Sequence, residues 1–325
     1  MPINGPSSYP ATTDQFLKHW TDANAKLGAG KAIVLTGNIS VADLQTKRDL
    51  LGTKRDAVTD AGLDRALARE ALTTLVTRLQ GKLVEFNGRV RADLPGSTFA
   101  RVLPGAFAVG AAESAVREAL RQMRTLWVKI NAVSPAPAGV VLPMVLLDGT
   151  TAAQAEADAE ALRVAYRALS DAEQALKLAR EERNDVQDVI YEILKSYRLK
   201  VPTAVPADDA LLQTLPALTP AAGHTPAAVK ATGAWDAASA EAKVTWTAST
   251  EAELSHYEVR GVAGESYNTD DETVLATIDA GVPRELRTDF ALSAPGLTAG
   301  FKVYVVLKTG NEKGSDAVYV KRPAA

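Results

Sequence analysis

The chain has 325 residues, a hydrophobic fraction of 46% and a formal net charge of −3, values that fit an ordinary globular protein of about two domains. It contains no cysteine, which excludes disulfides, thiolate metal sites and a cysteine nucleophile. Charge is balanced in both halves, with 26 basic and 25 acidic residues up to Thr225, then 10 and 14 from Pro226. Because phosphate backbones require a positive field, we expect no nucleic-acid partner.

The first 13 residues are rich in proline, glycine and serine, and they lack the basic and apolar regions of a secretory signal. We therefore expect the chain to be cytoplasmic as synthesised, or to belong to a particle or leave by a non-secretory route. The longest apolar run, residues 140–147, is much shorter than the roughly 20 residues that cross a bilayer. No membrane-spanning helix is expected.

A first amphipathic helix is predicted near the N-terminus. It follows the helix-starting residues 12–14 and has one apolar stripe, formed by Phe16, Trp20, Ala23 and Leu27. Gly28 and Gly30 are expected to end it; the sequence Gly-Ala-Gly-Lys at 28–31 is typical of a helix C-cap rather than of a phosphate-binding loop. Residues 32–35 are β-prone without a nearby partner strand, so we interpret them as an extended connector whose role the sequence does not define.

Two further helical segments are predicted from heptad spacing. Residues 40–93 are proline-free and helix-forming, with Gly62 as the expected break. Their apolar seam comprises Leu72, Val76, Leu79, Leu83, Phe86 and Val90. A second seam comprises Val116, Leu120, Met123, Trp127 and Ile130. The prolines between 135 and 143 then predict an extended apolar connector, which we expect to lie against another element.

The longest predicted helix begins after Thr150 or Thr151. Six of its positions stand seven residues apart: Leu162, Leu169, Leu176, Arg183, Ile190 and Tyr197. A helix over residues 151–198 would reach on the order of 70 Å, whereas the helix that carries Val116 reaches about 33 Å. The remaining stripe must be covered by residues 40–93, by the N-terminal helix or by another copy of the chain.

These six residues are therefore our predicted interaction surface, and we expect a homo-oligomer or a larger protein assembly. Arg183 interrupts the row. It either fixes the register or the number of partners, or it extends to solvent from the end of a bundle.

Prolines at 202, 206, 216, 220 and 226 predict a linker, with a short helical turn at 208–214. Beyond the linker the hydrophobic period changes to two, which is typical of an all-β module. The predicted domains are a helical bundle at 1–199, a Pro-rich linker at 200–225 and a β-sandwich at 226–325. The fold class is thus multi-domain α and β, a long-helix antiparallel bundle followed by an all-β sandwich.

Several residues of the last domain occupy characteristic positions: Trp246 within residues 243–249, Tyr257 and Val259, Leu297 before Phe301, and Gly314 with Ser315. This stretch resembles a fibronectin type III domain, which implies a β-sandwich. Phe301, which has no hydroxyl, stands close to the place of the family's usual strand tyrosine. The helical part, with Asn-Asp-Val-Gln-Asp-Val-Ile-Tyr at 184–191, resembles only bacterial proteins of uncharacterised function, which implies no activity.

Catalytic chemistry has no recognisable motif. His19, His224 and His256 lack metal-ligand spacing, and no Gly-x-Ser-x-Gly turn occurs. The acidic residues 270–272 are interpreted as a solvated turn rather than a calcium site. We expect no enzyme, no catalytic residue, no cofactor and no metal.

Two functions remain open on the sequence alone. The first is a non-catalytic structural or assembly subunit, in which a helical scaffold presents the β-sandwich; the excess apolar stripe favours it. The alternative is a monomeric recognition protein that binds a glycan or a protein through the sandwich. An exposed aromatic platform on the sandwich would favour the alternative.

Overall fold

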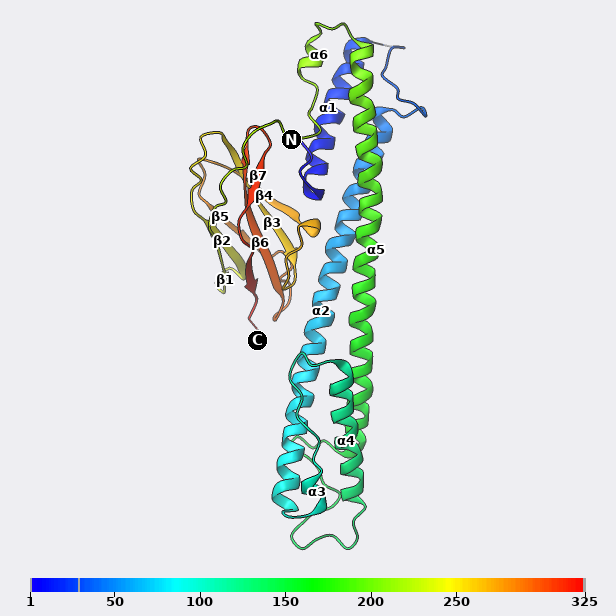
Figure 1. Ribbon diagram of the computed structural model, residues 1–325, viewed down its shortest axis with the longest axis vertical. Coiled ribbons are helices and arrows are strands. Elements are labelled where there is room, and N and C mark those ends of the chain that lie inside the picture. Colours follow the sequence, from blue (N-terminus) through cyan, green and yellow to red (C-terminus); the bar gives the residue numbers. More distant parts are fainter. Residues whose placement is uncertain (1, 29, 324–325) are drawn as a thin grey trace. The chain divides into compact units, whose positions relative to one another are not determined.

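A computed structural model describes residues 2–28 and 30–323. It confirms the predicted fold class, a helical region followed by antiparallel β-sheets (Figure 1). Contacts divide the chain into two compact units: the first comprises the residues up to Ala66 and those from Gln174, and the second comprises Leu67–Glu173. None of the described helices is both long and apolar enough to cross a membrane.

The helices of the first unit pack around aromatic side chains. They are η1 (Pro6–Ser8), α1 (Tyr9–Leu27), the N-terminal part of α2 (Val41–Asp93), the C-terminal part of α5 (Ala152–Ala204), and α6 (Ala210–Gln213). Trp20 of α1 stacks on Tyr197 of α5 with ring centroids 4.5 Å apart. Helix α1 begins at Tyr9, before the expected start at residues 12–14. Thr12 and Thr13 lie inside the helix, where their hydroxyls donate hydrogen bonds to the carbonyls four residues earlier.

Helix α2 is continuous through Gly62, so the break expected there is wrong. A glycine in a helix costs only about 1 kcal/mol relative to alanine. Leu63 and Ala66, in the same stretch, pack against the core of the sandwich, and this tertiary contact outweighs the low propensity of glycine. Helix α5 likewise extends past Pro202 to Ala204, since Val201 is fully buried against the first unit's helices.

The second unit contains the rest of α2, α3 (Thr98–Arg101), α4 (Glu113–Asn131) and the start of α5. Both predicted seams, on α2 and α4, are buried in its core. The apolar connector before α5 lies against α4, where Trp127 Nε1 donates a hydrogen bond of 2.9 Å to the Met144 carbonyl. Thr151 caps α5 as expected, because its hydroxyl accepts from the Gln154 amide while the Gln154 side chain accepts from the Thr151 amide.

The sandwich has two antiparallel sheets. The first has the order β1-β2-β5, with β1 Ala231–Asp236, β2 Glu241–Trp246 and β5 Glu285–Thr288. The second has the order β4-β3-β6-β7, with β8 also paired to β6; its strands are β3 Leu254–Ala263, β4 Thr273–Asp279, β6 Thr298–Leu307, β7 Glu312–Gly314 and β8 Val318–Lys321. A 3-10 turn, η2 (Thr269–Asp271), precedes β4. The two sheets form the predicted sandwich, and Phe301 lies fully buried in its core.

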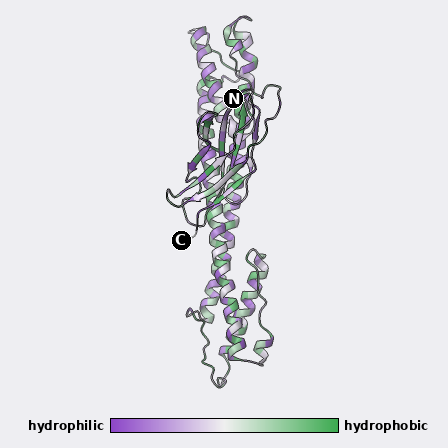
Figure 2. Cartoon of the chain, turned by 90° about the vertical axis from the view of Figure 1, so that its left-hand side faces the viewer, coloured by the Kyte–Doolittle hydropathy of each residue, from purple (hydrophilic) through white to green (hydrophobic). Residues whose placement is uncertain are grey.

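Strands β3 and β6 are buried on both faces, although their alternating sequence is typical of strands with one exposed face. Tyr257 and Phe301 point into the sandwich core, whereas Glu258, Arg260 and Tyr304 occupy the opposite face and are also buried. In Figure 2 the helices and strands alternate between hydrophobic and hydrophilic residues, so the pattern alone does not reveal this second covered face. Packing from other elements of the first unit covers it.

We expect Trp246→Ala to lower the free energy of unfolding by roughly 3–5 kcal/mol, because it removes a large buried side chain from the sandwich core. Trp246 is 6% exposed and makes an edge contact with the Tyr257 ring at 5.8 Å. Urea unfolding of the full chain measures the loss. Trp246→Phe, which removes a buried indole N–H that has no hydrogen-bond partner, should cost less. A loss below about 1 kcal/mol for the alanine variant would contradict the core assignment.

Candidate functional site: the junction of helices and sandwich

The six positions of the predicted interaction surface face inward. Leu162 is fully buried in the core of the second unit, and Leu169 packs partly buried against that core. Leu176 forms a small cluster with Val58 and Ala179 in the first unit. Ile190 and Tyr197 are fully buried against α1. Because α2 is unbroken, it supplies the cover that the sequence appeared to lack, and self-association through this surface stays a prediction.

Arg183, the sixth position, is 3% exposed and contacts the sandwich. Its Nη1 donates a hydrogen bond to the Asp270 carbonyl in η2, while Nε and Nη2 donate to the side-chain oxygen of Asn184. The guanidinium therefore anchors α5 to the turn before β4.

Two more arginines hold the same turn. Arg180 of α5 forms a bidentate ion pair with Asp271, including an Nε to Oδ1 distance of 2.7 Å. Arg55 of α2 donates to the Glu272 carbonyl at 3.3 Å and to the Ser7 carbonyl at 3.4 Å. A carboxylate and backbone carbonyls thus accept hydrogen bonds from all three guanidinium groups, of which that of Arg183 is buried. We call this contact of Arg55, Arg180 and Arg183 with residues 270–272 the junction.

The expectation of a solvated acidic turn at 270–272 is therefore wrong for two of its three side chains. The Asp271 side chain is 9% exposed and the Glu272 side chain 2% exposed. The arginines lie about ninety positions earlier on α5 or still further away on α2, so local sequence gives no sign of the pairing. Positively charged partners replace the water that would otherwise solvate the turn.

A buried ion-pair cluster continues from the junction across the outer face of the sheet. Arg260 donates to Glu258 at 2.7 Å, to Glu312 at 2.6 Å and to Glu272 at 3.2 Å. Its guanidinium also lies 3.8 Å from the centroid of the Tyr304 ring. We call these five residues the Arg260 cluster.

Tyr304 fits into the cluster because β7 carries a glycine beside it. A Cβ added to Gly314 would lie 2.8 Å from Cζ of Tyr304. The Tyr304 hydroxyl donates a hydrogen bond to Glu272, so the ring joins β6 to the junction. The residues Gly314 and Ser315, noted from the resemblance, thus have a packing role here: the hydroxyl of Ser315 accepts from the Val303 amide at 3.1 Å.

Burial affects the carboxyl groups of the cluster in different ways. Burial raises the pKa of Glu272 above its ordinary value, and the hydrogen bond from Tyr304 and the charge of Arg260 offset this only in part. Burial also acts to raise the pKa of Glu258, but the hydrogen bond with His256 and the charge of Arg260 outweigh it, so that pKa is lowered. The pKa of Arg55 is lowered by burial and by the nearby charge of Arg183. Burial therefore dominates at Glu272, whereas the partners of Glu258 dominate at Glu258.

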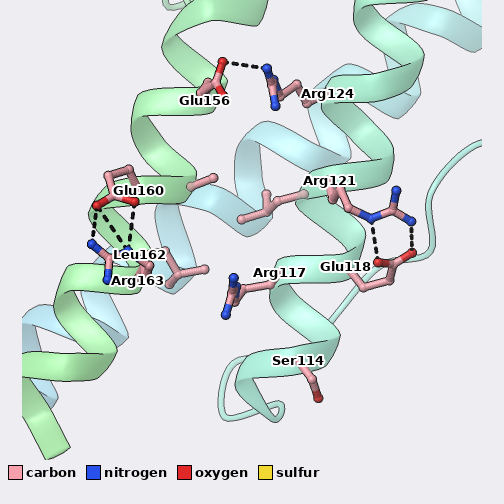
Figure 3. Close-up of a pocket in the computed structure, with 11 residues that line it drawn as sticks. Ser114, Arg117, Glu118, Arg121, Arg124, Glu156, Glu160, Leu162 and Arg163 are labelled. Carbon is pink, nitrogen blue, oxygen red and sulfur yellow. Dashed lines mark hydrogen bonds and ion pairs between the residues drawn. The ribbon is translucent and has the colours of Figure 1, made fainter.

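A second candidate site is a groove of about 500 Å³ between α4 and α5 in the second unit (Figure 3). Four arginines line it, and each has a carboxylate partner at 2.6–3.3 Å; the pairs are Arg117–Glu113, Arg121–Glu118, Arg124–Glu156 and Arg163–Glu160. Figure 3 shows the Arg124–Glu156 pair joining the two helices. Exposed pairs of this kind are screened by solvent and contribute little to stability. The groove has no unpaired arginine to attract an anion.

The three histidines lie apart from one another. His19 is buried between the Tyr197 hydroxyl and the Leu211 carbonyl, at 2.7 and 2.9 Å. His224 pairs with Glu251, and His256 lies 3.4 Å from Glu258. Across residues 2–28 and 30–323, no group of three or more histidine or acidic side chains is arranged to hold a metal ion.

No family model matches the chain, and no curated protein is similar to it. An Fn3-like protein from Clostridium thermocellum is 20% identical with a TM-score of 0.25, over 31% of this chain and 98% of that protein. The pectate lyase PelI of Erwinia chrysanthemi is 22% identical with a TM-score of 0.24, over 29% of this chain and 28% of its own. The pectate lyase Pel3 of Pectobacterium carotovorum is 11% identical with a TM-score of 0.24, over 29% of this chain and 27% of its own. These similarities cover under a third of this chain.

We expect Leu176→Asp to destabilise the monomer by several kcal/mol. Leu176 is 3% exposed, so the substitution places a charge in its apolar contact with Val58 and Ala179. Thermal unfolding followed by circular dichroism measures this. Leu178→Asp is the matched control, since Leu178 lies two residues further along α5 and is 56% exposed. Dissociation of an oligomer into folded monomers by Leu176→Asp would instead show that the position faces another copy.

Glu272→Gln tests the raised pKa in the cluster. A carboxyl group whose pKa is higher in the folded than in the unfolded state stabilises the fold most below its ordinary pKa, and this contribution is lost as the pH rises through the folded-state pKa. Glutamine is neutral at every pH. The variant should therefore match the wild type near pH 4 and be more stable than the wild type near pH 7.

Urea unfolding at pH 4 and at pH 7 measures the difference in the free energy of unfolding between the variant and the wild type. Glu265→Gln, at an exposed position of the sandwich, serves as the matched control for the loss of one carboxylate. A Glu272→Gln variant that is less stable relative to wild type at pH 7 than at pH 4 would contradict the raised pKa.

Proposed function

We propose that the chain is a non-catalytic structural subunit of a protein assembly, in which the α2–α5 hairpin holds the β-sandwich in one fixed orientation. The observation that carries this proposal is the junction, where three arginines from two helices bind a single turn of the sandwich. A sandwich attached only through a Pro-rich linker would need no such contact.

Two further features support a fixed orientation. The outer face of β3 and β6 is buried, including Val262 at 5% and Val306 at 1% exposure, so release of the sandwich would expose apolar as well as charged groups. The N-terminal segment also joins the two parts, because the Asn4 side chain donates to the Gly310 carbonyl at 2.6 Å and the Ile3 amide donates to the Leu218 carbonyl at 2.9 Å.

The alternative, recognition of a glycan or a protein by the sandwich, would be favoured by an exposed aromatic platform. Among the described sandwich residues, Tyr319 is the most exposed aromatic residue, at 45%. Its hydroxyl already accepts a hydrogen bond of 3.0 Å from the Tyr267 amide. The geometry therefore supports the scaffold over recognition through an aromatic platform.

Spin labels on both sides of the junction test the scaffold. The chain has no native cysteine, so Lys195→Cys on α5 and Asp316→Cys on the sandwich carry the only two labels. Pulsed electron paramagnetic resonance should give one narrow distance distribution. Adding Arg180→Ala and Asp271→Ala should broaden it, because the ion pair that joins α5 to the turn is lost.

The matched control removes a more exposed ion pair within the sandwich, Arg287 and Asp236, and should leave the distribution narrow. A broad distribution in the otherwise unchanged chain would refute the scaffold proposal.

A further inference from the structure

A groove of about 400 Å³ lies in the first unit between α5 and the segment that connects α1 with α2. Its lining comprises Leu35, Thr36, Ile39, Asp188, Val189, Glu192, Ile193 and Ser196. A cavity of roughly 150 Å³ holds a benzene molecule, so this groove has room for more than one aliphatic side chain.

The connecting segment forms a preformed wall of the groove. The Leu35 amide donates to the Ile39 carbonyl at 2.9 Å and closes a tight turn. Just before it, the Ile33 amide donates to the Asn24 side chain at 2.8 Å, and Trp20 Nε1 donates to the Ile33 carbonyl at 3.0 Å. Residues 32–35, whose role the sequence left open, are thus fixed to α1 and positioned beside α5.

The groove combines an apolar floor with an acidic rim. Leu35 and Ile193 are 6% and 5% exposed and form the floor, while Val189 at the edge is 44% exposed. Asp188 and Glu192 stand one helical turn apart on the rim. Asp188 forms no ion pair with any described residue, and Glu192 has only an exposed contact of 3.4 Å with Lys195. The rim therefore carries negative charge that this chain leaves largely uncompensated.

We propose that this groove binds an amphipathic helix of a partner protein, one that presents aliphatic residues flanked by lysine or arginine. The aliphatic side chains would fill the space between Leu35 and Val189, and basic residues one turn apart would pair with Asp188 and Glu192, which have the same spacing. Charge complementarity selects a basic partner over a neutral or acidic one. This inference rests on the proposed function and names the chemistry of the assembly partner.

The probe is a synthetic amphipathic helical peptide of leucine and lysine, with a leucine–glutamate peptide of the same pattern for comparison. Fluorescence anisotropy with the full-length chain should show saturable binding of the lysine peptide and none of the glutamate peptide. Asp188→Asn combined with Glu192→Gln should weaken binding by about tenfold or more. Val189→Ser should weaken it as well, because it removes apolar surface from the groove edge.

The matched control neutralises two exposed acidic residues of the sandwich, Glu265→Gln and Asp316→Asn, and should change affinity by less than about twofold. An equal loss in the control would show attraction to net charge alone and would overturn the proposal. Absence of binding to the wild-type chain would overturn it too. Sedimentation of the wild type as a dimer and of the Asp188→Asn, Glu192→Gln variant as a monomer would identify a second copy as the occupant, again against the proposal. None of these outcomes depends on the junction distances, so the scaffold can stand if this inference fails.

Discussion

The contact of three arginines of α2 and α5 with one turn of the sandwich is the constraint on which the first unit depends, and one of them, Arg183, is buried there. Buried guanidinium groups are tolerated only with acceptors in place, and here the acceptors are Asp271 and the carbonyls of Asp270 and Glu272. The turn, the outer face of the sheet and the two helices must therefore adopt their positions together.

Contact with the sandwich also explains why α2 is continuous. A break at Gly62 would separate Arg55, which contacts the turn, from Leu63 and Ala66, which pack against the sandwich core. Packing on both sides of the glycine keeps the helix intact, and the intact helix in turn covers the apolar row of α5. The apolar row is thus covered within the chain, while self-association through it stays a prediction. The groove that we propose as a docking site is lined by other residues of α5, among them Asp188 and Glu192.

Much of the fold could be predicted from sequence patterns, because these patterns depend on residues that lie close together in the chain. The heptad seams, the Thr151 cap and the core position of Trp246 each depend on residues close in the sequence. The candidate site could not be predicted in this way. Glu258 and Arg260 alternate with core residues as solvent-facing residues do, and nothing nearby in the sequence shows that Arg260 pairs with Glu312, 52 positions away.

Native-state hydrogen exchange measured residue by residue tests most directly whether helices and sandwich form one cooperative unit. If the junction couples them, the slowest amides of β3 and β6 and those of α5 around Arg183 should exchange with the same free energy of opening and respond equally to urea. Opening of the sandwich strands at a free energy well separated from that of α5, with a different urea dependence, would show two independent bodies and would contradict the account.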